Sequence, residues 1–386
     1  MSGGAAGGLA NRGGTSGGGG LVGAGGWATS DANAKRPDDA AVESDGPMAG
    51  TDAPLGGMAV GGAGGVGTTG GAGGALDAGP GDSPTAPPRP LPKKFAGGGT
   101  TFLDSNHEVR SDFLKYWDQL SPQEEGKWGS IANIEWDYST PGGTYRIEYR
   151  WTRFDAFYDF TRRNHIPLWE TALVWPYGNP SLSTDAAPAL IEDWIKQFCA
   201  RYPDTEFITV VETPSRVPIA VTTGLGGKGT TGYDWIVRAF VLARTYCPKS
   251  VLVLTDYDII EWADTNQKFL DMLTKIVAAG APVDAIGATG SDTTGLANDK
   301  LTGLIGKLAA TGLPIYITEY ALKGDDATQE AMMKEQFPLF WTNDQIKGIT
   351  FYGYVPGTTS GTGGPLILTA GSPRPALSWL MSYLGR

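Results

Sequence analysis

Short apolar runs rich in β-forming residues alternate with longer amphipathic stretches from residue 93 to the end of the chain. The amphipathic stretches repeat their apolar residues at helical spacing, as in PALIEDWIKQFCARY and NQKFLDMLTKIVAAG. Gly280 and Gly312 follow two of them, where a glycine commonly ends a helix. Strands that alternate with helices indicate βαβ units and a parallel sheet. The predicted strands are residues 95–102, 129–136, 166–175, 206–213, 250–259, 284–290, 314–322 and 348–355.

Eight β/α repeats predict a (β/α)8 TIM barrel over residues 93–386, an α/β fold whose active site lies at the C-terminal ends of its strands. A doubly wound open sheet is the competing fold, and it would carry a G-x-G-x-x-G sequence after its first strand. No such sequence is present there, and the GGG at 97–99 lies within the predicted strand. The barrel is therefore the predicted fold.

Residues 1–92 differ in kind from the rest, because they consist mostly of Gly, Ala, Pro, Ser and Asp with few large side chains. Such a segment cannot bury enough surface to offset the entropy cost of ordering it, so we predict a disordered linker. No signal-peptide pattern of basic and then apolar residues follows Met1. Since secreted or surface-attached hydrolases often carry such tethers, we expect a secreted or cell-surface protein whose export signal lies outside this sequence.

Charge and composition exclude several classes of function. The chain has 41 acidic and 30 basic residues, a formal net charge of −11, which argues against nucleic acid or an anionic membrane as a partner. There is no run of about 18 apolar residues, so no membrane span is expected. His107 and His165 lack ligand-like spacing, and neither a metal nor another cofactor is expected. The 12 Trp and 15 Tyr residues offer rings that stack on sugars, although cores also recruit them.

The only two cysteines, Cys199 and Cys247, each end a predicted helix just before a predicted strand. Both should therefore lie at the same end of the fold. A disulfide in an oxidising compartment is one interpretation, and two buried free thiols are the other. The sequence leaves this choice open.

Two glutamates stand at the C-terminal ends of predicted strands. Glu319 follows PIYIT and Glu212 follows FITVV, and a buried carboxyl is costly unless it is paired or used. Because the fourth and seventh strands of a barrel lie on opposite sides of its mouth, the two side chains can converge across it. Two carboxyls about 5–5.5 Å apart form the retaining glycosidase arrangement, in which like charge raises one pKa relative to the other. Either glutamate alone would be read as structural, but together they predict a catalytic pair.

The chain resembles glycoside hydrolase family 10, the retaining xylanase family, over nearly all of residues 93–386. The resemblance rests on TALVW, VVETP, LTDYDI, VDAIG and ITEY at successive predicted strands, and on GITFYGY followed by GGPLILTAGSPRPAL. It implies a retaining endo-1,4-β-xylanase acting on polysaccharide or oligosaccharide. By the same resemblance, Glu212 is the acid/base and Glu319 is the nucleophile.

The match breaks at positions where the family contacts the sugar. Val211 stands where the family has an asparagine that hydrogen-bonds the sugar 2-hydroxyl, and Thr171 replaces a histidine. Glu135 matches a sugar-binding lysine, Tyr320 replaces a leucine after the nucleophile, and residues 357–362 replace a tryptophan loop. Removing one contact that tightens in the transition state typically costs about 2–4 kcal/mol. The resemblance therefore carries over the fold and the glutamate pair, but not the substrate.

Several other side chains are candidates for contacting the substrate at the predicted mouth. Glu135 and Glu170, on the predicted second and third strands, are candidates to replace the lost contacts. A surface acid is the other interpretation of both, and for Glu170 it is at least as good. Aromatic residues at strand ends are candidates for stacking, with core packing as the alternative. The predicted substrate-binding residues are Glu135, Trp136, Thr171, Trp175, Asp256, Tyr257, Tyr320 and Tyr352.

Three functions remain open at this point. The first is a secreted or surface-tethered endo-xylanase, and the second is a hydrolase of another β-glycan with an altered cleavage subsite. The third is a catalytically weak barrel that binds polysaccharide. The glutamate pair favours an enzyme, whereas Val211 favours the binding protein. A monomer is expected in each case.

Overall fold

The computed structural model describes residues 93–101, 107–137, 139, 144–177, 179–180, 182–183, 185–358, 364–369 and 371–386. These residues belong to one compact unit, Pro84–Arg386. The predicted linker, residues 1–92, lies outside the described residues, as does most of the predicted loop 357–362.

Eight parallel strands form one sheet in the order β2-β1-β10-β9-β8-β7-β6-β5. A parallel bridge between Leu120 and Leu168 joins the two outer strands, so the sheet closes on itself. The predicted (β/α)8 barrel is therefore confirmed. The barrel strands are β1 (Phe95–Thr100), β2 (Leu120–Pro122), β5 (Trp169–Val174), β6 (Phe207–Glu212), β7 (Val251–Asp256), β8 (Ala285–Thr289), β9 (Ile315–Tyr320) and β10 (Ile346–Tyr352).

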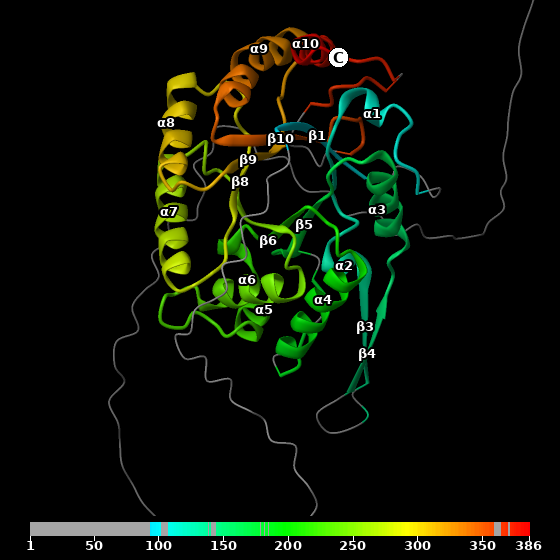
Figure 1. Ribbon diagram of the computed structural model, residues 1–386, viewed down its shortest axis with the longest axis vertical. Coiled ribbons are helices and arrows are strands. Elements are labelled where there is room, and N and C mark those ends of the chain that lie inside the picture. The colour runs from blue at the N-terminus through cyan, green and yellow to red at the C-terminus, as the bar shows by residue number, and fades with distance from the viewer. Residues whose placement is uncertain are drawn as a thin grey trace, which may run out of the picture. The chain divides into compact units, whose positions relative to one another are not determined.

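Helices surround the sheet, and their apolar faces form the larger core against its outer side (Figure 1). Gly280 and Gly312 take the left-handed conformation after two of these helices, with φ of 91° and 78°, as expected of residues that end a helix. The helices are α1 (Phe113–Tyr116), α2 (Trp128–Ile131), α3 (Thr152–Asn164), α4 (Ala187–Arg201), α5 (Ile219–Gly224), α6 (Asp234–Tyr246), α7 (Ala263–Ala278), α8 (Asn298–Ala309), α9 (Asp326–Thr342) and α10 (Pro375–Leu384), with a 3-10 turn, η1, at Pro214–Arg216.

The second barrel strand is not where the sequence analysis put it. Residues 129–136, predicted as that strand, form α2 and β3 (Ala132–Asp137), and β3 pairs antiparallel with β4 (Thr144–Tyr149). This hairpin projects away from the barrel (Figure 1). The true strand, β2, has only three residues and ends on a proline, so its period-2 signal is too short to read.

The barrel interior is layered. An aromatic plug fills the end where the strands begin, with Phe95, Trp169, Phe207 and Tyr316 packed within about 6.4 Å of one another, ring centre to ring centre. Hydroxyl side chains lie above it: Thr209 accepts from the Trp169 indole at 2.9 Å and meets Thr255 at 3.3 Å. This packed floor limits any ligand to the C-terminal end of the barrel.

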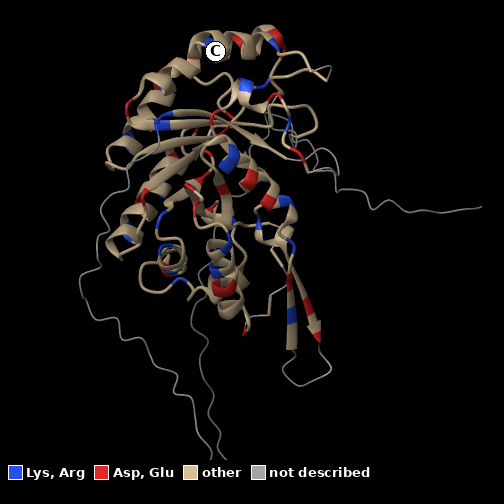
Figure 2. Cartoon of the chain, turned by 45° about the vertical axis from the view of Figure 1, so that its right-hand side comes forward, with Lys and Arg blue, Asp and Glu red and all other residues tan. Residues whose placement is uncertain are grey.

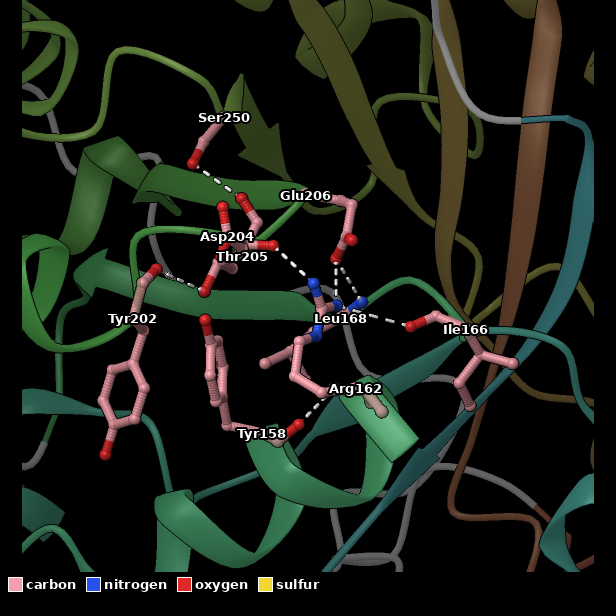
Figure 3. Close-up of polar contacts among 10 residues, drawn as sticks. Tyr158, Arg162, Ile166, Leu168, Tyr202, Asp204, Thr205, Glu206 and Ser250 are labelled. Carbon is pink, nitrogen blue, oxygen red and sulfur yellow. Dashed lines mark hydrogen bonds and ion pairs between the residues drawn. The ribbon is translucent and has the colours of Figure 1, made fainter. Parts of the chain in front are cut away.

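A hydrogen-bond network ties together the opposite end of three neighbouring strands (Figure 3). Arg162 of α3 donates to the Glu206 carboxylate at 2.6 Å, and that carboxylate also accepts from the Leu168 N–H at 2.9 Å. Thr205 accepts at its carbonyl from Ser250 at 2.7 Å. The network joins the starts of β5, β6 and β7, so their C-terminal ends are held in a fixed relation.

Acidic and basic residues are interspersed along the helices and the β3–β4 hairpin in the view of Figure 2. Across the part of the chain that the structure describes, no helix is both long and apolar enough to cross a bilayer.

Cys199, near the end of α4, and Cys247, just after α6, form a disulfide with their Cα atoms 5.1 Å apart. Both residues are buried. Of the two interpretations that the sequence left open, the structure therefore supports the disulfide and not two free thiols.

We expect the double variant Cys199→Ser/Cys247→Ser to unfold more easily. The disulfide closes a loop of 48 residues, and losing that constraint on the unfolded chain should lower the free energy of unfolding by roughly 2–4 kcal/mol. Denaturant titration of the variant and of the wild type measures the difference, with the wild type in reductant as the matched control. Coincident unfolding curves in all three samples would contradict the prediction.

Candidate active site

A cavity lies at the C-terminal ends of the barrel strands. Every barrel strand except β8 contributes lining residues. Glu212 from β6 and Glu319 from β9 both line it, together with Thr171 from β5 and Tyr352 from β10. The structure therefore brings the two predicted catalytic glutamates into one cavity.

A bulge in β6 turns Glu212 toward the cavity. Thr209 and Val211 pair with two consecutive residues of β7, so β6 carries one extra residue here. An unbroken alternation of sides would put Val211 inside the barrel. Instead Glu212 lines the cavity, and Val211 is fully buried in the core that includes the surrounding helices. The position matched to the family's sugar-binding asparagine is thus not among the lining residues.

A second bulge, in β9, overturns the prediction that Tyr320 binds substrate. Three steps along β9, from Ile317 to Tyr320, oppose two steps along β10. Thr318 and Glu319 consequently both line the cavity. Tyr320 is fully buried on the other side, where its hydroxyl donates to Gln336 Oε1 of α9 at 3.3 Å. Without the bulge, alternation would have placed Tyr320 inside the barrel, and the prediction is wrong for that reason.

The backbone is left-handed at Glu319, with φ of 53°, and at Thr213, directly after Glu212, with φ of 50°. A non-glycine residue in this region costs on the order of 1–3 kcal/mol and persists only where the surrounding fold enforces it. The two strand ends that bear the glutamates therefore store conformational strain.

Burial raises the pKa of both carboxyls. It raises the pKa of Glu319 to about 8, and the negative charge of Glu212 acts in the same direction. Burial also raises the pKa of Glu212, while the Lys127 ammonium and the Trp175 indole act in the opposite direction. Both glutamates therefore hold a proton more readily than an exposed carboxyl does.

Lys127, which the sequence analysis missed, is the cation of this site. It follows β2, its side chain is only 10% exposed, and its ammonium lies 2.9 Å from a Glu124 carboxylate oxygen. The ammonium also lies 3.4 Å from the centre of the Trp175 ring. Its charge lowers the pKa values of Glu212 and Glu319 against the effect of burial. Its position soon after the second barrel strand could have identified Lys127 as a site residue. The sequence analysis missed it because it placed that strand at residues 129–136.

Glu135 and Trp136 do not lie at the end of a barrel strand, so their predicted place at the mouth is wrong. Both belong to β3 of the projecting hairpin. The Glu135 side chain is 60% exposed and forms an ion pair with Arg146 at 3.6 Å. Trp136 packs against Tyr145 of β4, with ring centres 5.3 Å apart. The alternation of the hairpin had been read as that of the second barrel strand.

Three other predicted residues, Trp175, Asp256 and Tyr257, are not among the residues that line the cavity. Trp175 follows β5 beneath the Lys127 ammonium. Asp256, the last residue of β7, accepts from the Tyr257 N–H at 2.9 Å, and burial, aided by the charge of Glu212, raises its pKa to about 7. The half-buried Tyr257 lies under the Arg216 guanidinium. Their contact with substrate stays a prediction.

Glu170 is a buried carboxyl with no polar partner. It is fully buried on β5, and neither of its carboxyl oxygens has a hydrogen-bond partner among the described residues. It packs so closely on Gly126 that a Cβ at that position would overlap it. Burial raises its pKa to about 8 although the Lys127 charge acts in the opposite direction. The interpretation of Glu170 as a surface acid is therefore wrong.

No group of three or more His, Cys, Asp and Glu side chains in the described part of the chain is arranged to hold a metal ion.

Residues 94–383 match the model of a family described as glycosyl hydrolase family 10. Endo-1,4-beta-xylanase B of Cellvibrio japonicus is 37% identical over 302 residues, which cover 76% of this chain and 46% of that protein. The chain thus spans less than half the length of this relative. Endo-1,4-beta-xylanase B of Thermotoga neapolitana is 24% identical over 285 residues, covering 64% of this chain and 81% of that one.

Solved structures share the fold at low sequence identity. A GH10 structure from Paenibacillus barcinonensis superposes with a TM-score of 0.62 at 18% identity, covering 76% of this chain and 95% of the other. Xylanase 10B from Thermotoga petrophila, solved in complex with xylobiose, gives 0.60 at 22% identity over 76% and 94% of the two chains.

We expect Glu170→Gln to stabilise the fold increasingly as the pH rises. Folding raises the pKa of Glu170 from its ordinary 4.5 to about 8, so the native state binds more protons than the unfolded state between these values. The free energy of unfolding of the wild type therefore falls as pH rises through this window, and the variant lacks that loss. The gain should reach up to a few kcal/mol by about pH 8.

Urea titrations at pH 5 and pH 8 measure the effect as the difference between variant and wild type. Glu135→Gln, an exposed glutamate, is the matched control and should show no such pH dependence. A stability difference for Glu170→Gln that does not change with pH would refute the prediction.

Proposed function

Because the chain belongs to glycosyl hydrolase family 10, we propose that it is a retaining endo-1,4-β-xylanase. The observation that carries the proposal is the pair Glu212 and Glu319, which come from well-separated strands of one barrel and line one cavity, where burial raises the pKa of each. Retaining glycosidases require one protonated and one ionised carboxyl at the scissile bond. A site that raises carboxyl pKa values favours retention of the proton that this chemistry needs.

Glu212 acts first as the acid and then as the base. It protonates the glycosidic oxygen while the Glu319 carboxylate attacks the sugar carbon, so the leaving sugar departs and a covalent glycosyl-enzyme forms. Glu212 then removes a proton from water, which displaces Glu319 from the sugar. The bulge in β9 serves this chemistry by presenting Glu319 to the cavity rather than to the outer core.

Lys127 opposes the protonation of both glutamates. Without a buried positive charge, desolvation would hold both carboxyls neutral, and a neutral Glu319 is no nucleophile. The ammonium lowers the pKa of both glutamates, and its position on the Trp175 ring fixes it beside them.

A second candidate, a hydrolase of another β-glycan, is favoured by Val211. This side chain is fully buried outside the cavity, so it offers the sugar 2-hydroxyl no hydrogen bond. Gln123 and Tyr352 line the cavity and bring polar groups to it.

Export to an oxidising compartment belongs to the same proposal. The buried Cys199–Cys247 disulfide supports it, since such bonds persist mainly outside the reducing cytosol. A monomer as the working unit is part of the same proposal.

We expect Glu212→Ala and Glu319→Gln each to lower kcat on xylan by at least about 10²–10⁴-fold, since each removes a group that acts in the transition state. Reducing-sugar release from xylan and from a panel of other β-glycans measures it. Glu135→Gln, on the hairpin, is the matched control and should keep wild-type activity.

The two glutamates should also separate by leaving group. A dinitrophenyl glycoside needs no protonation, so Glu212→Ala should still release the phenol, whereas Glu319→Gln should not. Near-wild-type turnover in Glu319→Gln would overturn the proposal. If the wild type degrades no polymer of the panel but is retarded in a gel that contains polysaccharide, the protein is a polysaccharide-binding protein and not a hydrolase.

A further inference from the structure

Arg216 is an exposed cation that forms no ion pair with a carboxylate in the part of the chain that the structure describes. Every other described arginine except Arg163 forms an ion pair with a carboxylate. A guanidinium without a carboxylate partner is unexpected in a chain with a net charge of −11. Its place, four residues after Glu212, puts it next to the proposed chemistry.

Two tyrosines hold the Arg216 guanidinium in place. Its carbon lies 4.7 Å from the centre of the Tyr257 ring, and one of its terminal nitrogens donates to the Tyr177 hydroxyl at 3.1 Å. Tyr177 in turn packs edge-on against Trp175, with ring centres 5.0 Å apart. One contact uses the face of the guanidinium and the other uses one of its five N–H groups, so donors remain for a planar, two-oxygen acceptor.

Asp256 does not pair with this cation. The Arg216 charge lowers the pKa of Asp256 against the effect of burial, but no ion pair within 4.0 Å joins the two. Asp256 is buried and its carboxylate accepts from the Tyr257 N–H instead. The guanidinium therefore keeps its charge and an open side toward solvent.

Arg216 and Tyr257 lie on the Glu212 side of the site, since the neighbouring Asp256 feels the charges of both Glu212 and Arg216. They follow β6 and its neighbour β7, and β6 carries Glu212, the acid proposed to protonate the leaving oxygen. Glu319, which would hold the other sugar covalently, belongs to β9, farther along the sheet. The sugar that departs must pass on the Glu212 side, and so beside Arg216.

We propose that Arg216, held by Tyr177 and Tyr257, binds a carboxylate carried by the glycan on the leaving-group side, and that the protein thereby prefers chains bearing uronic acid. The inference rests on the proposed function for the identity of the backbone. A guanidinium and a carboxylate match in geometry, and two hydrogen bonds with charge give both affinity and orientation. An acidic chain would otherwise be repelled by the net charge of the protein.

The test uses one polymer in two forms. Xylan with glucuronic acid branches is compared with the same xylan after chemical reduction of its carboxyls to neutral hydroxymethyl groups. We expect the wild type to show kcat/KM about tenfold higher on the acidic form at low ionic strength, as for one accessible charged hydrogen-bond pair. Arg216→Gln should bring the ratio of kcat/KM on the acidic xylan to kcat/KM on the reduced xylan to about 1. Arg216→Lys should keep part of the preference for the acidic form.

Arg163→Gln is the matched control. Arg163 is the other described arginine without an ion pair, and it lies in the last turn of α3, at the opposite end of the barrel from the cavity. Its variant should keep the wild-type ratio. A wild-type ratio near 1, or a ratio that Arg216→Gln leaves unchanged, would overturn the inference.

Retardation in native gels containing each polymer separates this inference from the proposed function. A protein that cleaves neither polymer, but is retarded more by the acidic form through Arg216, would keep the carboxylate site and refute the hydrolase. A protein that cleaves both forms equally, with equal retardation, would keep the hydrolase and refute the carboxylate site.

Discussion

Several carboxyls lie out of water at one end of this barrel, and one buried lysine is the cation that offsets most of them. Burial raises the pKa values of Glu170, Glu212 and Glu319, and Lys127 lowers the pKa of each. The cation is itself fixed, by Glu124 on one side and the Trp175 ring on the other. Since an unpaired buried charge is far more costly than a paired one, the protonation of the whole cluster depends on this ammonium.

The fold accepts strain to build this cluster. A regular strand would place Val211 and Tyr320 inside the barrel, and each bulge exchanges such an apolar or packing residue for a glutamate. The exchange requires left-handed backbone at Glu319 and beside Glu212, at Thr213. The aromatic plug below and the network of Figure 3 at the strand starts hold the barrel rigid enough to sustain it. Rigid support of a strained, charged rim is how such a scaffold keeps reactive groups in position.

Seven of the eight barrel strands could be found from the sequence, because each is a clear apolar run between amphipathic stretches. The strand β2 could not, since three residues ending in Pro122 carry no period, and the alternation of the β3–β4 hairpin took its place. That error placed Glu135 at the mouth of the barrel and left Lys127 unnoticed.

The glutamate pair could be predicted because both residues end their strands. Which neighbouring residues face the barrel interior and which face the helices could not be predicted, because a bulge adds one residue without any local signal in the sequence. Tyr320 is the residue that this uncertainty misplaced. Glu170 shows the same limit, since nothing in WETAL tells a surface acid from a carboxyl buried without a partner.

The central claim, that Glu319 attacks the sugar while Glu212 handles the proton, is tested most directly by trapping the covalent intermediate. An activated 2-fluoro xylobioside slows the second step of a retaining enzyme, so the glycosyl group stays on the nucleophile long enough for peptide mass spectrometry. The account predicts one sugar per protein, on the peptide that contains Glu319. A label on another residue, or rapid hydrolysis with inverted configuration and no label, would contradict it.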